Sequence, residues 1–146
     1  VEGRIENGEE PVPVVLSKRY QFRKNLILLA YSLYSPAPQD VMVLFAPELN
    51  IAFSEPENVR VFTDEKHPEG VSMIMEDRGI NSRIGITADA PFARNAMVMN
   101  IPYLADQGIV SEYQQHNILL GWKVNLLTAS RQEPWTLSLQ IKIDKV

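Results

Sequence analysis

The sequence predicts an all-β protein: an antiparallel β-sandwich of about nine strands with at most one short helix, or alternatively a closed β-barrel. Three observations predict this class. Large apolar residues alternate strictly with polar ones over residues 135–143. Turn-forming residues recur about every eight to twelve positions along most of the chain. Little of the sequence has a convincing helical period, so βαβ units are not expected.

The stretch from Trp135 to Ile143 is the clearest strand in the sequence. Successive side chains of a strand point to opposite faces of a sheet, so a period of two places one set in the core and the other in water. A helix would distribute the same apolar residues around its circumference, and we therefore reject it. The apolar set is Trp135, Leu137, Leu139, Ile141 and Ile143, and the polar set between them is Thr136, Ser138, Gln140 and Lys142.

Residues 1–11 are rich in glutamate and contain few apolar side chains. They lack the hydrophobic surface that offsets the entropy lost on ordering, so we expect a flexible acidic arm ahead of a single domain over residues 12–146. The segment 12–22 is typical of a strand. Pro11 and Pro13 place its start at a sheet edge, because proline donates no ladder hydrogen bond. The sequence predicts a partner-binding edge here, made of Val12, Val14, Leu16, Lys18 and Tyr20.

Residues 25–34 are compatible with two structures. Four apolar side chains would line one face of a helix, whereas the same run suits a strand that is buried on both sides. The tyrosines and the neighbouring strands favour the strand. Short strands are then expected at 41–45, 51–54 and 59–62, separated by residues that favour turns.

Gly79 marks the best hairpin in the sequence, between strands expected at 71–76 and 83–87, because glycine readily adopts the positive φ of tight turns. Further strands are expected at 95–101 and 118–127. Residues 109–115 are compatible with either a strand or a single helical turn.

The chain has 146 residues and no cysteine, and it is long enough to bury a core without disulfides. Thiolate zinc sites and a cysteine nucleophile are excluded. The net charge of −4 argues against general binding of nucleic-acid backbones. The longest apolar run, 26–31, is too short to cross a bilayer as a helix, so no transmembrane span is expected. We favour an extracytoplasmic location (periplasm, cell surface or virion) over the cytoplasm.

Signals for catalysis are sparse. His67 and His116 are the two histidines, and neither lies at zinc-site spacing from another ligand. Two pairs of adjacent carboxylates, 64–65 and 76–77, are more typical of solvated turns than of the opposed pair in a glycosidase. Glycine-rich phosphate loops and a nucleophile elbow are missing. We therefore expect a protein without enzymatic activity, metal or cofactor.

One basic cluster, residues 18–24, interleaves cations with aromatic side chains. Single-strand nucleic-acid binders use such an arrangement, but an edge strand protected by charge has the same pattern. The acidic balance of the chain favours the second interpretation. No nucleic-acid partner is expected.

We expect a non-enzymatic structural or protein-interaction subunit of a larger assembly, such as a surface fibre or pilus, a secretion apparatus or a viral particle. Such a subunit would associate through its sheet edges, either as a homo-oligomer or with another subunit. The alternative is a binding module for a small apolar or sugar ligand in a barrel mouth or sandwich cleft. Aromatic side chains near predicted loops would contact that ligand: Tyr31, Tyr34, Phe92, Tyr103 and Tyr113.

Overall fold

The computed structural model describes residues 1–6, 8, 10–64, 71–89, 93–105 and 108–146, with side chains outside 63–64, 71–72, 93–105 and 108–112. These residues form strands and one 3-10 turn, η1. The elements are β1 (Glu2–Ile5), β2 (Val12–Arg23), β3 (Leu26–Tyr34), β4 (Met42–Phe45), β5 (Glu48–Ile51), η1 (Pro56–Asn58), β6 (Val59–Asp64), β7 (Val71–Asp77), β8 (Ser82–Ala88), β9 (Ala93–Ala105), β10 (Gly108–Asn125) and β11 (Trp135–Lys145).

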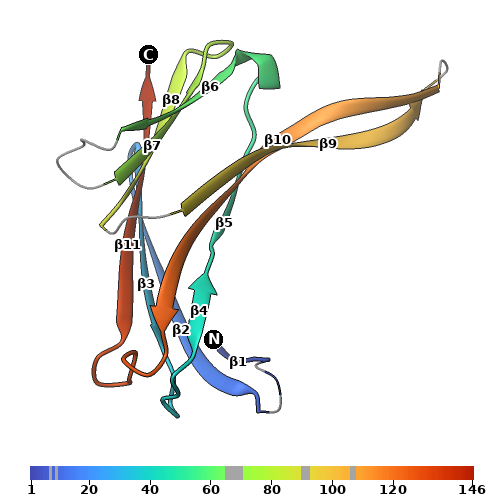
Figure 1. The fold of residues 1–146 in the computed structure, drawn as a ribbon. Helices are drawn as coiled ribbons and strands as arrows, with labels where there is room; N and C mark the ends of the chain where they lie inside the picture. Colours follow the sequence, from blue (N-terminus) through green and yellow to red (C-terminus); the bar gives the residue numbers. More distant parts are fainter. Residues whose placement is uncertain (7, 9, 65–70, 90–92, 106–107) are drawn as a thin grey trace.

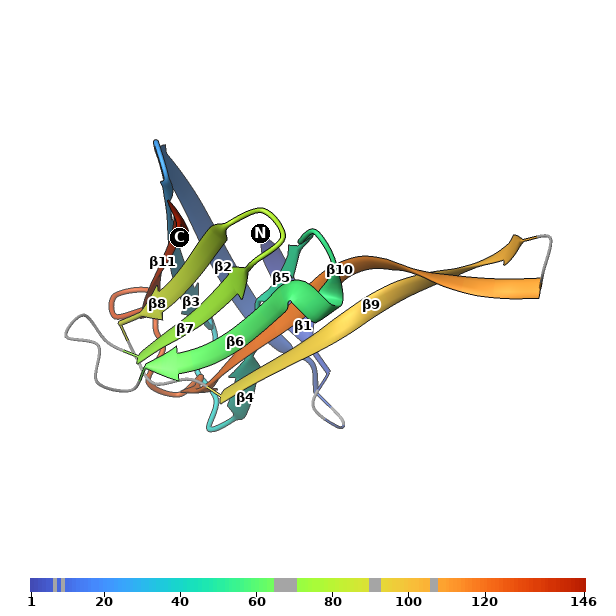
Figure 2. The same cartoon turned by 90° about the horizontal axis from the view of Figure 1, so that it is seen from above.

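Two antiparallel sheets pack face to face, so the predicted all-β sandwich is confirmed (Figures 1 and 2). The larger sheet has the order β1-β2-β3-β11-β8-β7-β6, and the smaller one joins β4, β5, β9 and β10. They are two separate sheets and not a closed barrel. The short turn η1 is the one helical element in the described part of the chain.

Strand β11 lies in the middle of the larger sheet, between β3 and β8. Its alternation has the predicted effect over most of its length: Leu137, Leu139 and Ile141 are buried, whereas Thr136, Ser138 and Gln140 are exposed. Ile143, which was expected on the core face, is 43% exposed near the end of the strand. Leu139 pairs with Leu29 of β3, which confirms the strand and excludes the helix for residues 26–34. The expected burial on both sides is wrong, because Leu29, Tyr31 and Leu33 enter the core whereas Ala30, on the other face, is exposed. The hairpin expected around Gly79 is also present, since β7 and β8 pair from Asp77↔Ser82 onward. The positive φ in its turn, 49°, belongs to Asn81 and not to Gly79.

The smaller sheet is built along the 18-residue strand β10. β4 and β5 follow one another along one side of it in one unbroken register, from Val43↔Val124 to Ile51↔His116. The strand expected at 51–54 therefore lies earlier, at 48–51. β9 pairs along the other side of β10, and the hairpin of these two strands extends away from the sandwich (Figures 1 and 2). Residues 109–115 belong to this hairpin and are a strand, not a helical turn.

The core lies between the two sheets. Its main cluster joins side chains of β3, β7, β8 and β11 in one sheet to Ile118, Leu120 and Trp122 of β10 in the other. Phe45 of β4 closes one side, with edge-to-face ring contacts to Tyr31 and Trp135 at centroid distances of 5.1 and 5.3 Å. Burial of this apolar surface is the main source of stability for such a domain.

Residues 2–5 form a strand, although the sequence analysis placed them in a flexible arm. β1 pairs antiparallel with the first part of β2, in a register that includes Glu2↔Val15 and Ile5↔Val12. Val1 and Leu16 then exchange two backbone hydrogen bonds of 2.8 and 2.9 Å. Backbone pairing to an existing sheet edge thus positions a segment whose side chains carry little apolar surface.

Replacing Leu139 with alanine should lower the free energy of unfolding by about 2–5 kcal/mol, because it leaves a cavity at a fully buried position. Urea unfolding followed by tryptophan fluorescence measures the change. Leu127→Ala is the matched control, since Leu127 is 51% exposed and its truncation should change the stability by less than about 0.5 kcal/mol. Equal losses in the two variants would contradict the core described above.

Candidate functional site

The outer face of the larger sheet carries a shallow trough over β2, β3 and β11. The side chains that point away from the core surround two adjoining hollows of about 490 and 380 Å³, which share Arg19, Ala30 and Ser138. We call this surface the outer trough. Its outward side chains are Ser17, Arg19, Gln21, Leu28, Ala30, Ser32, Thr136, Ser138 and Gln140.

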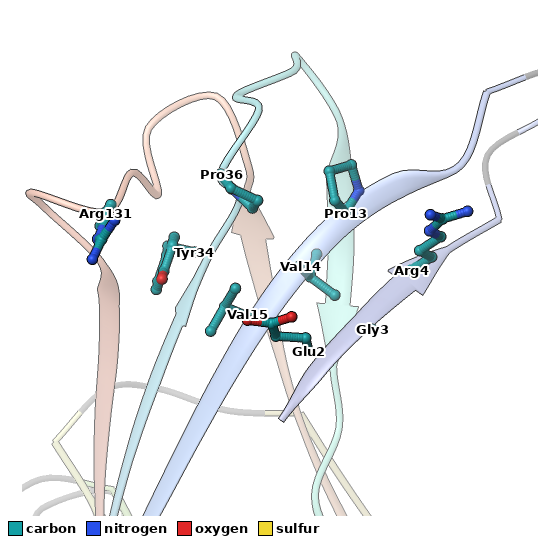
Figure 3. Close-up of a pocket in the computed structure, with 9 residues that line it drawn as sticks. All are labelled: Glu2, Gly3, Arg4, Pro13, Val14, Val15, Tyr34, Pro36 and Arg131. Carbon is teal, nitrogen blue, oxygen red and sulfur yellow. The ribbon is translucent and has the colours of Figure 1, made fainter.

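A third hollow, of about 460 Å³, continues the trough beyond Ser17 and Ser32. Val15 and Tyr34, which are paired across β2 and β3, line it together with Glu2 and Arg4 of β1. Arg131 reaches it from the connection between β10 and β11, and Figure 3 shows Tyr34 between Arg131 and Val15. The remaining lining residues are Gly3, Pro13, Val14 and Pro36.

The three hollows follow one another along β2, from Val15 to Gln21. At roughly 3.3 Å per residue, this distance is about 20 Å. Their described lining supplies hydroxyl, amide and guanidinium groups along most of its length, an aromatic ring at one end, and a single carboxylate, that of Glu2. Such a surface can form hydrogen bonds along an extended ligand that is rich in hydroxyl groups.

A second surface lies on the inner face of β2, beyond the part that the smaller sheet covers. Tyr20 and Phe22 are 50% and 72% exposed, and their rings are parallel to within 6° at a centroid distance of 6.1 Å. The Lys18 ammonium group lies 4.6 Å from the centre of the Tyr20 ring, a cation–π contact. These three side chains leave an apolar strip at the surface, flanked by a cation.

A buried polar cluster joins β7 to the segment before η1. The carboxylate of Asp77, which is fully buried, accepts hydrogen bonds from the Ser54 hydroxyl at 2.6 Å, the Ser54 amide at 2.6 Å and the Gly79 amide at 2.8 Å. Burial alone would raise the pKa of Asp77, but these hydrogen bonds and one from the Ile80 amide together lower it.

His116 lies beside this cluster on β10. A β-bulge between Tyr113 and Gln115 lets Tyr113 approach the same end of the sandwich, and its hydroxyl lies 2.8 Å from His116 Nδ1. Burial lowers the pKa of His116, with a smaller opposing effect from Asp77.

Serine, histidine and aspartate are thus neighbours here without forming a catalytic triad. In a triad the serine hydroxyl bonds to the histidine, whereas Ser54 donates directly to Asp77 and His116 bonds to Tyr113. The cluster fastens β5, η1 and β10 to the β7–β8 hairpin.

The structure separates the aromatic residues that the sequence analysis grouped as ligand contacts. Tyr31 is 3% exposed and belongs to the core, while Tyr34 lines the hollow at the end of the outer trough. Tyr113 bonds to His116, away from the trough. Tyr103 lies on β9, but its side chain is outside the described residues, as is the whole of Phe92. His67 also falls outside them.

The predicted partner edge is divided by β1. β1 pairs with Val12 and Val14, and Val1 continues this pairing to Leu16. This half of β2 is therefore not an open edge. Within the described part of the chain, Lys18 and Tyr20 pair with β3. Partner binding at this edge stays a prediction.

The residues of the outer trough were not singled out from the sequence. The sequence analysis recognised Thr136, Ser138 and Gln140 as solvent-facing positions of one strand, but polar residues on one strand do not reveal which neighbours complete a site. The register of β2, β3 and β11 places Arg19 beside Ala30 and Ser138.

The described residues hold no group of three or more histidine, cysteine or acidic side chains placed to bind a metal ion. They also include no helix with the length and hydropathy to cross a bilayer.

Comparison with known proteins gives a likeness in structure but none in sequence. No protein-family model matches the chain, and no curated protein matches it in sequence. Among solved structures it is similar to the 4-α-glucanotransferase from Thermococcus litoralis, with a TM-score of 0.70 and 15% sequence identity. The match covers 100% of this chain and 20% of the glucanotransferase chain. The chain therefore spans about a fifth of that protein, and at this identity the likeness shows the fold alone.

Replacing Asp77 with asparagine should lower the free energy of unfolding at neutral pH by about 1–3 kcal/mol, because buried donors lose their charged acceptor. The pKa of Asp77 is below its ordinary value of 3.8 in the folded state. Its contribution to stability is therefore complete above pH 3.8 and is lost as the pH falls through the folded-state pKa. Urea unfolding at a series of pH values should show a smaller acid-dependent loss in Asp77→Asn than in the wild type.

Asp40→Asn provides the control for this experiment, since Asp40 is exposed. The free energy of unfolding of this variant should depend on pH as that of the wild type does. If the free energies of unfolding of the wild type and Asp77→Asn depended on pH equally below pH 4, Asp77 would not accept the hydrogen bonds described above.

Proposed function

We propose that the chain acts as a non-catalytic sugar-binding module whose ligand is a linear α-glucan, bound along the outer trough. The observation that carries the proposal is the row of exposed hydroxyl, amide and guanidinium groups that follows three strands and ends at Tyr34. The sequence analysis gave a sugar-binding module as its alternative and placed the ligand in a barrel mouth or a cleft. The site proposed here is the outer face of one sheet.

The chemistry of the trough supports an extended ligand that is rich in hydroxyl groups. Sugar hydroxyls both donate and accept hydrogen bonds, as do the hydroxyl and amide side chains of Ser17, Ser138 and Gln140. Arg19 adds a fixed array of donors in the middle of the surface. The ring of Tyr34 offers an apolar face on which the C–H groups of a sugar can pack.

The structural likeness supports the choice of α-glucan among possible sugars. The similar protein is, by its name, a 4-α-glucanotransferase, and the whole of this chain matches part of it. This domain would then serve as an accessory unit that holds a glucan rather than transforming it.

The absence of a paired carboxylate favours binding over catalysis. Glycoside chemistry generally needs two carboxyl groups that flank the scissile bond. The described lining of the trough holds one, Glu2 at its end.

A second candidate is the interaction subunit of a larger assembly that associates through a sheet edge. One specific observation favours it: among the described strands, β3 alone pairs with residues 17–23 of β2. The two candidates use different sides of the same strand and do not exclude one another.

Arg19→Ala and Tyr34→Ala should each weaken the binding of maltoheptaose, an α-1,4-linked oligosaccharide, by tenfold or more. A hydrogen bond to a charged group contributes about 1.5–3 kcal/mol, and about 1.4 kcal/mol corresponds to a tenfold change. Isothermal titration calorimetry measures the affinity, with cellohexaose as a β-linked comparison.

Arg60→Ala and Tyr20→Ala are matched controls. Arg60 is exposed on β6, at the far edge of the same sheet, and Tyr20 is an exposed tyrosine on the inner face. Both variants should bind maltoheptaose like the wild type. If maltoheptaose gives no heat of binding, or if Arg19→Ala and Tyr34→Ala leave its affinity unchanged, the proposed function is wrong.

A further inference from the structure

The surface around the outer trough carries an excess of positive charge, although the chain as a whole has a net charge of −4. Arg19 lines the two adjoining hollows, and Arg4 and Arg131 line the hollow at the end of the trough. Arg23 shares the outward face of β2 with Arg19, because every second residue of a strand lies on the same side. The described lining opposes these cations with one carboxylate, that of Glu2.

Other charged side chains on the outer face of this sheet are paired with one another. Arg83 of β8 binds Glu76 of β7, and in β11 the Lys142 ammonium nitrogen lies 2.9 Å from a carboxylate oxygen of Asp144. Each of these carboxylates therefore already has a cationic partner. The charge that they cancel is not the charge of the trough.

Arg19 and Arg131 have no such partner. Neither forms an ion pair or a side-chain hydrogen bond within the described part of the chain, although Glu133 is only two residues from Arg131. Both side chains are exposed. Their N–H donors and their charge are therefore available to a ligand.

Small side chains leave the Arg19 guanidinium group accessible from above the sheet. Across the strands, Arg19 pairs with Ala30, and Ala30 pairs with Ser138. The row beside Arg19 thus rises little above the backbone, and a ligand that lies on it passes next to the guanidinium group.

Arg131 provides a second cationic point at the end of the trough. Figure 3 shows it on the side of Tyr34 away from Val15. Val15, which pairs with Tyr34, precedes Arg19 by four positions on β2, so the rows of Tyr34 and Arg19 are roughly 13 Å apart along the trough. A ligand that extends over both rows meets two guanidinium groups in succession.

We infer that the glucan bound in the outer trough carries oxyanion groups on its sugar units, phosphate monoesters or carboxylates, and that Arg19 and Arg131 bind them. A guanidinium group is planar, and its paired N–H donors match the oxygens of a phosphate or a carboxylate. An unmodified glucan accepts hydrogen bonds from the same donors but supplies no counter-charge. The inference deepens the proposed function by naming the class of glucan, and it rests on that function.

The test compares forms of one oligosaccharide that differ in a single group. Isothermal titration calorimetry with the whole chain measures the affinity for maltoheptaose, for maltoheptaose with one phosphate on a sugar O6, and for maltoheptaose with one C6 oxidised to a carboxylate. At least one anionic form should bind tenfold or more tightly than the unmodified sugar, because charge-assisted hydrogen bonds are stronger than neutral ones. This preference should decrease as the salt concentration rises. The anionic form that shows it identifies the group.

The double variant Arg19→Gln/Arg131→Gln removes both charges and keeps a hydrogen-bonding amide at each position. It should abolish the preference for the anionic form, so that anionic and unmodified maltoheptaose bind with the same affinity. Comparing two ligands within one variant cancels any loss of folded protein or of shared sugar contacts. Arg60→Gln is the matched control, since Arg60 is exposed on β6 and lies outside the trough, and it should keep the wild-type preference.

Four results would overturn the inference. Equal binding of all three sugars to the wild type would do so and would leave the proposed function intact. A preference that persists in Arg19→Gln/Arg131→Gln would place the anion elsewhere. Inorganic phosphate that competes as well as the phosphorylated sugar would show an isolated anion site, and tighter binding of oligothymidine would identify a nucleic-acid surface. If none of the three sugars binds, the proposed function itself is wrong and the inference falls with it.

Discussion

The larger sheet depends on the backbone hydrogen bonds of β11. On one side of it lie β1, β2 and β3, and on the other β8, β7 and β6, each a set of strands that are neighbours in sequence. The last strand of the chain joins the two sets. Its apolar side chains enter the core and its polar side chains form part of the outer trough. One alternating stretch of sequence thus supplies both the stability of the sheet and one wall of the candidate site.

The fold could be predicted where a strand or a turn has a local sequence pattern. Alternation identified β11, and Gly79 between two apolar runs identified the β7–β8 hairpin. Other features depend on contacts that no local pattern contains. β1 forms because an edge of β2 is available, and β9 continues through Pro102 because it is an edge strand that can tolerate a missing donor.

The candidate site was harder to predict than the fold. Tyr34 was expected to contact a ligand and lines a hollow, whereas Tyr31, three residues earlier, was expected to do the same and is buried in the core. The difference is one of parity, since odd and even positions of a strand face opposite sides. Which of the two sets faces the core depends on the pairing register, and the register depends on the partner strand. For the same reason, Arg19 and Ser138 could not be recognised as neighbours from their positions in sequence.

Gly79 and Ser54 come from different loops and approach one another very closely. A β-carbon built on Gly79 would lie 2.2 Å from the Ser54 hydroxyl oxygen and 2.9 Å from its β-carbon. If the Ser54 hydroxyl turned away from this β-carbon, it would lose its hydrogen bond to Asp77. During divergence of this fold, the two positions are therefore not free to change separately. A side chain at position 79 would require Ser54 and Asn58 to move, and Asp77 would then lose the Ser54 hydroxyl as a donor.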